Sequence, residues 1–208
     1  MPKDFLHIAT IDVRSIATPE RQAEFETVEK IKFDIIGLSE TRMSGAGSLD
    51  LRSGYSLYYS DDNGRTSRGV GFYVSSLLNR DIECYSHSER IIELVLTTSS
   101  RTCLRIIQVH APHSDYEDSN CEDPLNDHTR IIDSRRNEHL GVFGDFNANV
   151  GSARANERYI GPNAAKTRNR RGGMLAEFCE KRRLYLANIF SFEKGRTQDG
   201  CGKIMHWD

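Results

Sequence analysis

The sequence predicts an α/β protein whose buried strands end on polar side chains. Apolar runs stop on carboxylates or on a histidine in four places, at the ends of residues 5–12, 33–40, 103–110 and 140–147. Short alternating segments separated by turn residues indicate antiparallel strands, of the kind that form half of a β-sandwich. Segments with helical spacing of apolar residues lie between strands, so we expect helices packed on a sheet.

The chain begins with a predicted strand and a predicted helix. Residues 5–11 are mostly apolar, and Asp12 follows where this strand ends. Thr18 suits a helix N-cap, Pro19 suits the first helical position, and the following glutamate complements the positive helix end. Apolar residues then recur at positions 25, 28 and 31. We therefore expect this helix to cover one face of the sheet.

Residues 33–40 form a second strand that ends on an acid, Glu40. A core strand rarely accepts a glutamate, because burying its charge is costly unless the carboxylate is paired or binds a cation. The alternative explanation is an exposed glutamate just beyond the strand. Residues 41–53 are small and polar, which predicts a loop.

The middle of the chain predicts a hairpin or a meander. Further strands are expected at residues 55–59, 69–74, 82–85, 90–97 and 103–109. The last of them leads into His110, which is either a surface imidazole or a site residue. Residues 114–136 predict a loop followed by a helix.

The segment 140–147 is the strongest candidate for chemistry. Strand alternation would place Asp145 and Asn147 on one side and Phe146 in the core. Carboxylate and carboxamide oxygens suit a hard cation or a phosphate. An asparagine-rich turn after a core strand is the alternative, but the second carboxylate at Glu40 favours a site.

The C-terminal part predicts a polar loop, a helix with Met174, Leu175 and Phe178 on its inner face, and a strand from 184 to 190. No strand is expected from 195 to 208. Basic residues surround this helix, as a solvated face or as contacts to phosphates. They are Lys166, Arg168, Arg170, Arg171, Lys181, Arg182 and Arg183.

Bulk properties indicate one globular domain over residues 1–208. Hydrophobic residues make up 38% and charged residues 28% of the chain. A net charge of −2 and a pI near 6.4 provide no global attraction for nucleic acid. No apolar run approaches the roughly 18 residues of a membrane span, and no signal peptide is evident, so we expect an intracellular protein, nuclear or cytoplasmic, with no membrane partner. The five scattered cysteines suggest reduced thiols.

Taken in order, these motifs resemble the endonuclease/exonuclease/phosphatase superfamily, which has a deoxyribonuclease I-like fold. The resemblance is greatest to the apurinic-type endonuclease domain of LINE-type retrotransposons and of craniofacial development protein 2-like sequences. The matching segments are residues 10–15, 34–42, 69–72, 107–112, 144–148 and 168–180. The resemblance implies a four-layer α/β sandwich, in which two mostly antiparallel sheets pack face to face with helices outside.

The resemblance also implies a monomeric enzyme that hydrolyses phosphodiester bonds in DNA with Mg²⁺, or with Mn²⁺ as the alternative ion. On this pattern Glu40 and Asp12 hold the metal, and Asp145 orients or deprotonates the attacking water. Asn147 and His110 complete the catalytic set at the scissile phosphate. The implied substrate contacts are Arg14, Arg168, Asn169 and Arg171.

Three departures from the family pattern change the expectation. Asp12 replaces an asparagine, His110 replaces a tyrosine, and no Ser-Asp-His motif follows. We therefore expect a domain that is incomplete at its C-terminus, lacks its last strands, and is weak or inactive as an endonuclease. The alternatives are a nucleic-acid-binding module without catalysis and a small-molecule or lipid phosphatase of the same superfamily.

Overall fold

The computed structural model describes residues 6–27, 33–61, 68–78, 81–97, 103–112, 131, 139–189 and 201–205. The chain divides into two compact units, residues 1–110 and residues 111–208. The prediction of a single domain stays a prediction. The predicted helix within 114–136 lies outside the described residues apart from Ile131.

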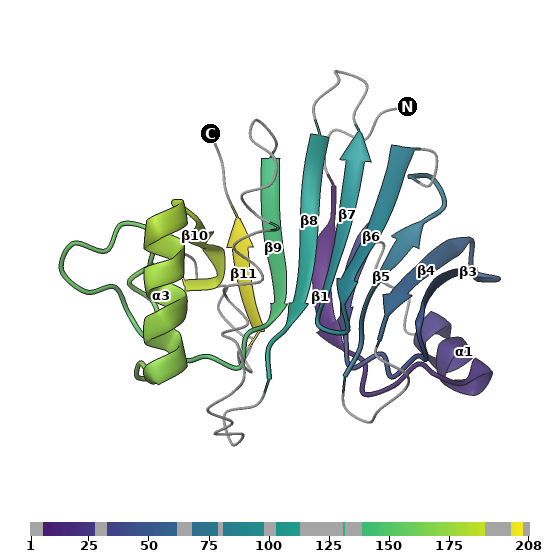
Figure 1. Ribbon diagram of the computed structural model, residues 1–208, viewed down its shortest axis with the longest axis horizontal. Helices are drawn as coiled ribbons and strands as arrows, with labels where there is room; N and C mark the ends of the chain where they lie inside the picture. Colours follow the sequence, from purple (N-terminus) through teal and green to yellow (C-terminus); the bar gives the residue numbers. More distant parts are fainter. Residues whose placement is uncertain are drawn as a thin grey trace. The chain divides into compact units, whose positions relative to one another are not determined.

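The first unit contains a five-stranded mixed sheet with strand order β1-β2-β5-β4-β3 (Figure 1). Its strands are β1 (Ile8–Asp12), β2 (Ile35–Ser39), β3 (Ala46–Asp50), β4 (Tyr55–Ser60) and β5 (Val70–Ser75). β1 and β2 are parallel, and the other pairs are antiparallel. The prediction of a loop throughout 41–53 is wrong for β3, which is an edge strand with every residue exposed. Its pairing depends on backbone hydrogen bonds, which leave no apolar pattern in the sequence.

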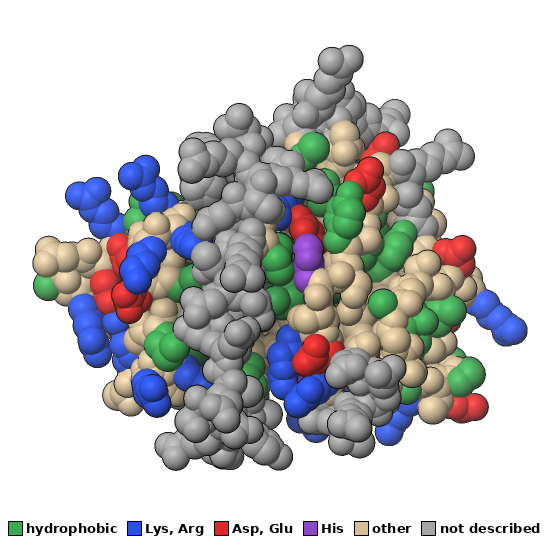
Figure 2. Space-filling model, viewed as in Figure 1, with side chains coloured by type: hydrophobic (Ala, Val, Ile, Leu, Met, Phe, Trp, Pro, Cys, Tyr) green, Lys and Arg blue, Asp and Glu red, His purple; other side chains and the backbone are tan. Residues whose placement is uncertain are grey.

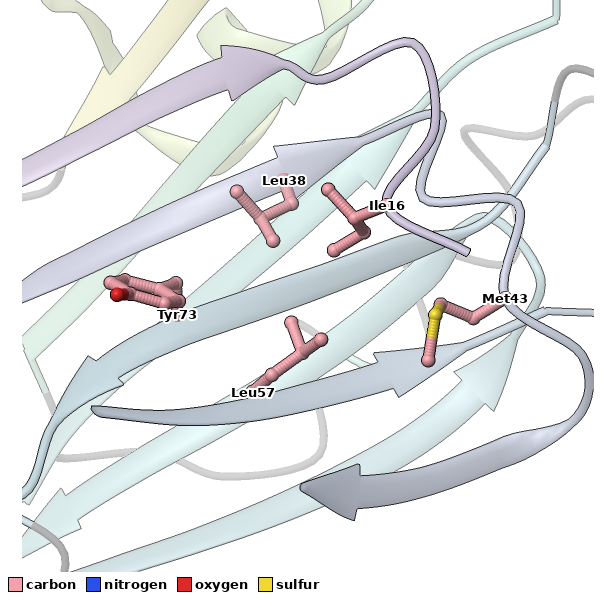
Figure 3. Close-up of a cluster of buried hydrophobic side chains, with 5 residues drawn as sticks. All are labelled: Ile16, Leu38, Met43, Leu57 and Tyr73. Carbon is pink, nitrogen blue, oxygen red and sulfur yellow. The ribbon is translucent and has the colours of Figure 1, made fainter. Parts of the chain in front are cut away.

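Helix α1 (Pro19–Thr27) confirms the predicted N-cap, because Oγ1 of Thr18 accepts a hydrogen bond from the backbone N–H of Arg21. Phe25 packs edge-on against Tyr73, with 5.2 Å between the ring centroids. The other predicted apolar positions of this helix, 28 and 31, lie outside the described residues. Beside this contact lies a core cluster (Figure 3) formed by Ile16, Leu38, Met43, Leu57 and Tyr73.

Three antiparallel strands form the second layer of the first unit: β6 (Ile82–Ser88), β7 (Ile91–Thr97) and β8 (Cys103–His110). Gln108 on β8 is fully buried, and its Nε2 donates to Oγ1 of Thr10 at 3.0 Å and to Oγ of Ser39 at 3.1 Å. These two hydroxyl groups belong to β1 and β2. A carboxamide from one layer therefore ties together two strands of the other.

The strand facing Gln108 must carry a glycine. A Cβ atom at Gly37 would lie 2.1 Å from Oε1 of Gln108, which is far inside van der Waals contact. The two layers of the first unit thus pack face to face around the Gln108 side chain. The absence of a side chain at Gly37 leaves the space that this carboxamide fills.

The opposite face of β7 and β8 buries an ion pair. Nε of Arg105 lies 2.6 Å from Oε1 of Glu93, and both side chains are almost fully buried. Nε2 of His87 lies 2.7 Å from the other carboxylate oxygen. Burial raises the pKa of Glu93, but the hydrogen bonds from Arg105 and His87 outweigh this effect and keep the pKa below its usual value.

The second unit contains β9 (His139–Asp145), β10 (Tyr185–Leu186) and β11 (Cys201–Met205), in the antiparallel order β10-β11-β9. β11 overturns the prediction that residues 195–208 hold no strand. The strand predicted over 184–190 is also wrong in part, because β10 ends at Leu186 and a 3₁₀ turn, Ala187–Ile189, follows. The buried positions 184, 186 and 189 do not continue a strand alternation.

Helix α3 (Arg170–Arg182) confirms the second predicted helix. Leu175 and Phe178 are buried as expected, but Met174 is exposed and does not lie on the inner face. Among the described residues, no helix is long and apolar enough to cross a membrane.

Candidate active site

The parallel pairing of β1 and β2 brings two carboxylates to one edge of the sheet. Asp12 lies opposite Ser39 in this register, and the N–H of Val13 donates to the carbonyl oxygen of Ser39 at 3.1 Å. Glu40 follows immediately. Because the carboxyl ends of parallel strands meet at the same edge, Asp12 and Glu40 leave neighbouring strand ends.

The backbone at this edge is strained. Arg14, Ser15, Glu40 and Arg42 all have positive φ, at 50°, 119°, 56° and 54°. Such conformations cost roughly 1–3 kcal/mol each for residues other than glycine, and they concentrate at functional sites. Residues within three positions of the end of each strand are therefore held in backbone conformations that residues other than glycine rarely adopt.

Glu40 carries its own counter-ion. Its Oε2 lies 2.8 Å from Nη2 of Arg42, and 14% of the Glu40 side chain is exposed. The turn is anchored by backbone hydrogen bonds from Thr41 to Gly69 and from Arg42 to Arg68. Glu40 is thus a mostly buried, paired carboxylate, which disfavours the alternative of a glutamate free in solvent.

Asp12 and Arg14 form an exposed turn. Oδ1 of Asp12 accepts the backbone N–H of Arg14 at 2.9 Å. Arg14 is exposed. The structure therefore brings Asp12, Arg14 and Glu40 to one edge of the first unit.

His110 is not a surface imidazole, because only 3% of it is exposed. It ends β8, where its backbone N–H donates to the carbonyl oxygen of Arg90, and its own carbonyl oxygen accepts from Nη1 of Arg90. Strand alternation puts His110 on the same face of β8 as Gln108, which is the face toward β1 and β2.

In the second unit, Asp145 and Asn147 are joined by a turn. The strand ends at Asp145, and Asn147 is left-handed with φ 47°. The N–H of Asn147 donates to Oδ1 of Asp145 at 2.8 Å, so a turn, rather than strand alternation, joins the two residues. Phe146 is buried between them as predicted, with 5% exposed.

Ala111 holds this turn from the side. Its N–H donates to the carbonyl oxygen of Asp145 at 2.8 Å, and its carbonyl oxygen accepts from Nδ2 of Asn147 at 2.7 Å. Ala111 is also the residue that follows His110 in the chain. Asp145 and Asn147 are thus both hydrogen-bonded to the backbone of Ala111.

Asn169 connects the turn to α3. Its Oδ1 accepts from the N–H of Gly172, which makes it the helix N-cap, and also from the N–H of Asn149. Its own N–H donates to the carbonyl oxygen of Asn149 at 2.9 Å. A Cβ atom at Gly172 would lie 1.7 Å from that same carbonyl oxygen, so the helix start and the loop are in tight contact.

The basic residues around α3 are largely engaged. Lys and Arg side chains gather on the surface of this helix (Figure 2). Arg168, however, is bound by Glu157 and by loop carbonyls, and Arg171 donates to the carbonyl oxygen of Pro112. Lys181 pairs with Glu177 one turn away. The structure does not bring Arg168 or Arg171 into direct contact with Asp145 or Asn147 through any of these bonds.

Three residues that hold these sites in place have no role assigned from the sequence. Gln108 had a signal, because a carboxamide inside an apolar strand must find hydrogen-bond partners when buried. Arg42 lies in the matching segment 34–42, but the resemblance assigns no role to it. Glu157 had no signal, since its partner Arg168 is 11 positions away across an irregular loop.

The donor set of the first unit fits a hard divalent cation. No group of three or more His, Cys, Asp or Glu side chains is placed to hold a metal ion within the described ranges. Mg²⁺ does not require such a group, because it commonly binds one or two carboxylates and completes its shell with water and substrate oxygens. The carboxylates of Asp12 and Glu40 meet that requirement.

Known proteins resemble the chain in sequence and in fold. No family model matches it. Craniofacial development protein 2 of Bos taurus is 29% identical over 191 residues, and that of Tragulus javanicus is 28% identical. Both alignments cover 91% of this chain but only 32% and 33% of the relatives. The chain therefore spans about a third of the length of the curated relatives it matches.

Among solved structures, an endonuclease/exonuclease/phosphatase family protein from Leptotrichia buccalis C-1013-b superposes with a TM-score of 0.58 at 15% identity, over 97% of this chain and 87% of that one. The chain has the endonuclease/exonuclease/phosphatase fold. The Xenopus laevis APE2 catalytic domain shares this fold, with a TM-score of 0.52 at 16% identity, covering 82% of this chain and 67% of that domain.

The human Nocturnin catalytic domain also has the endonuclease/exonuclease/phosphatase fold. Its TM-score is 0.51 at 14% identity, and the match covers 96% of this chain and 82% of that domain. These similarities confirm the predicted resemblance and the predicted deoxyribonuclease I-like α/β sandwich.

Proposed function

We propose that the chain hydrolyses phosphodiester bonds in DNA with a divalent metal ion, as a retrotransposon-type endonuclease. The observation that carries this proposal is the placement of Asp12 and Glu40 at neighbouring ends of parallel strands. The Asp145–Asn147 turn supplies a second carboxylate-and-carboxamide pair of the type that such chemistry needs.

In this proposal Glu40 and Asp12 hold Mg²⁺ or Mn²⁺. The metal, when bound, neutralises charge that develops on the phosphoryl oxygens. Asp145 accepts a proton from, or orients, the attacking water, as a carboxylate does in general base catalysis. The hydrogen bond from the N–H of Asn147 fixes the carboxylate of Asp145 for that role.

Asn147 and His110 are proposed to contact the scissile phosphate. One N–H of the Asn147 carboxamide is used by the carbonyl oxygen of Ala111. A carboxamide nitrogen has two N–H groups, so the second is available for a phosphate oxygen. Arg14, exposed at the edge beside Asp12, is the proposed contact to a neighbouring phosphate.

We further propose that the activity is weak. Asp12 places a negative charge where the related pattern has a neutral amide, and this charge repels an anionic phosphate unless the metal offsets it. His110 replaces a phenol, and its buried imidazole has a different reach and different hydrogen-bonding groups.

A plasmid-nicking assay with the 208-residue chain tests this function. We expect slow nicking that requires Mg²⁺ and stops when the metal is chelated. Glu40→Gln and Asp145→Asn keep the side-chain shape but remove the charge, and each is expected to lower the rate by roughly 100-fold or more. Glu24→Gln, on the exposed surface of α1, is the matched control.

The outcome also separates the alternatives. Nicking that is indifferent to both site substitutions would contradict the assignment. DNA binding that weakens with salt but is never followed by cleavage would instead indicate a binding module. Hydrolysis of a soluble phosphate ester without cleavage of DNA would indicate a phosphatase.

A further inference from the structure

The guanidinium group of Arg168 is engaged on several sides. Its Nη1 lies 2.6 Å from Oε1 of Glu157, and its Nη2 lies 2.8 Å from Oε2. Nη2 also donates to the carbonyl oxygen of Ser152 at 3.2 Å, and Nε donates to that of Val150. Only 7% of the side chain is exposed. A guanidinium has five N–H donors, and these contacts occupy most of them in one plane.

Glu157 is shaped to receive this group. Besides the two bonds from Arg168, its Oε2 accepts the backbone N–H of Arg154 at 2.7 Å. The hydrogen bonds from Arg168 hold the pKa of Glu157 below its usual value, so the carboxylate is charged at neutral pH. A phosphate would have to compete with a bidentate carboxylate for the same donors.

The loop that Arg168 holds is the continuation of the Asp145–Asn147 turn. Val150 and Ser152 accept from the guanidinium, and a Cβ atom at Gly151 would lie 2.9 Å from the backbone nitrogen of Arg168. Residues 150–152 are therefore pressed against Arg168 through both its backbone and its side chain.

The next residue extends this contact toward the turn. Asn169 exchanges two hydrogen bonds with Asn149, which lies only two positions after Asn147. Residues 149–152 are thus bound along their length by residues 168 and 169. Movement of one segment must move the other.

We propose that Arg168 is a positioning residue that fixes the Asp145–Asn147 turn through Glu157 and two loop carbonyl groups, and that it does not contact the DNA. This inference rests on the proposed function of the turn. It replaces the role that the sequence suggested for Arg168 as a substrate contact.

Steady-state cleavage of DNA by the 208-residue chain distinguishes the two roles. Arg168→Gln and Glu157→Gln should each lower kcat by about 10- to 100-fold, as is typical when a residue that orients a catalytic group is lost. KM should stay within roughly twofold, because no ground-state contact is removed. The double variant should be no slower than the slower single variant, since both substitutions break one unit.

If Arg168 contacts DNA directly, Glu157→Gln should strengthen DNA binding instead of leaving it unchanged. If Arg168 binds a phosphate, Glu157→Gln releases its guanidinium and tightens DNA binding, while Arg168→Gln weakens binding and reduces the salt slope by about one. Either result would overturn the positioning role. Glu177→Gln, which breaks an exposed ion pair with Lys181 on α3, is the charge-matched control and should change nothing.

Hydrogen exchange followed by mass spectrometry gives a readout that does not need activity. Both variants should speed exchange in peptides covering 145–152 and leave the peptide covering β9 protected. Unchanged exchange in 145–152 would contradict the inference. If the wild-type chain cleaves no DNA but the loop loosens as described, the proposed function fails while the positioning role is supported.

Discussion

Nη2 of Arg42 lies 2.8 Å from Oε2 of Glu40, although both residues have left-handed backbone conformations. A proposed metal ligand therefore already has a cation beside it. Because a bound metal would bring like charge close to the guanidinium, Arg42 and the metal compete for the same carboxylate.

Removal of this competitor should tighten metal binding. A partly exposed ion pair contributes about 0.2–1 kcal/mol, so Arg42→Met should lower the Mg²⁺ concentration for half-maximal nicking by roughly 1.4- to fivefold. Arg21→Met, which breaks an exposed pair with Glu24, is the control. A higher Mg²⁺ requirement would mean that Arg42 orients Glu40 instead of competing for it.

Replacement of Gly37 should destabilise the protein as long as Gln108 is present. Gly37→Ala places a Cβ atom 2.1 Å from Oε1 of Gln108, and overpacking of this kind costs about 1–3 kcal/mol. Adding Gln108→Ala removes the clash, so the double variant should be less destabilised than the sum of the two single variants, as measured by urea denaturation. Additive losses would show that the clash is relieved elsewhere.

Substitution of two adjacent glycines in α3 by alanine should change the free energy of unfolding in opposite directions. Gly172→Ala drives a methyl group against the carbonyl oxygen of Asn149 and should lower the free energy of unfolding. A Cβ atom at Gly173 meets nothing within 4 Å, so Gly173→Ala should raise it by about 0.5–1 kcal/mol, the usual gain in a helix interior. Thermal unfolding of both variants checks this, and equal effects would contradict the tight contact.

The contribution of Glu157 to stability should disappear in acid. Hydrogen bonds from Arg168 depress the folded-state pKa of Glu157 below its unfolded value, which is about 4.3. The stabilisation is therefore complete above the unfolded pKa and is lost as the pH falls through the folded pKa. The difference in unfolding free energy between wild type and Glu157→Gln should shrink over that range, and a gap independent of pH would refute the assignment.

The sequence predicts well those helices and strands that are specified by the pattern of their own side chains. β2, β8 and β9 are apolar runs, and α1 begins at a threonine cap. β3 escapes prediction because every residue of this strand is exposed, so its pairing with β4 leaves no apolar pattern in the sequence. β10 is shorter than predicted because an apolar run also suits a 3₁₀ turn when its buried positions are unevenly spaced.

The candidate site is predicted as a set of residues but not as an arrangement. Asp12 and Glu40 are recognisable as strand ends, yet their proximity depends on a parallel register that no local pattern encodes. Arg168 and Arg171 look alike in the sequence. Their different contacts come from Glu157 and from Pro112, which is 59 positions from Arg171, so only the fold distinguishes them.

The polar link between Gln108 and Thr10 spans 98 residues of sequence, which gives it a consequence during synthesis. Contacts at such separation form late, because the loop between them must first be closed. At a translation rate of about 5–20 residues per second, the 98 residues between the partners take roughly 5–20 s to emerge. During that interval the hydroxyl groups of Thr10 and Ser39 remain hydrated. Until β8 is made, these two hydroxyl groups thus give the nascent first sheet a partly polar face.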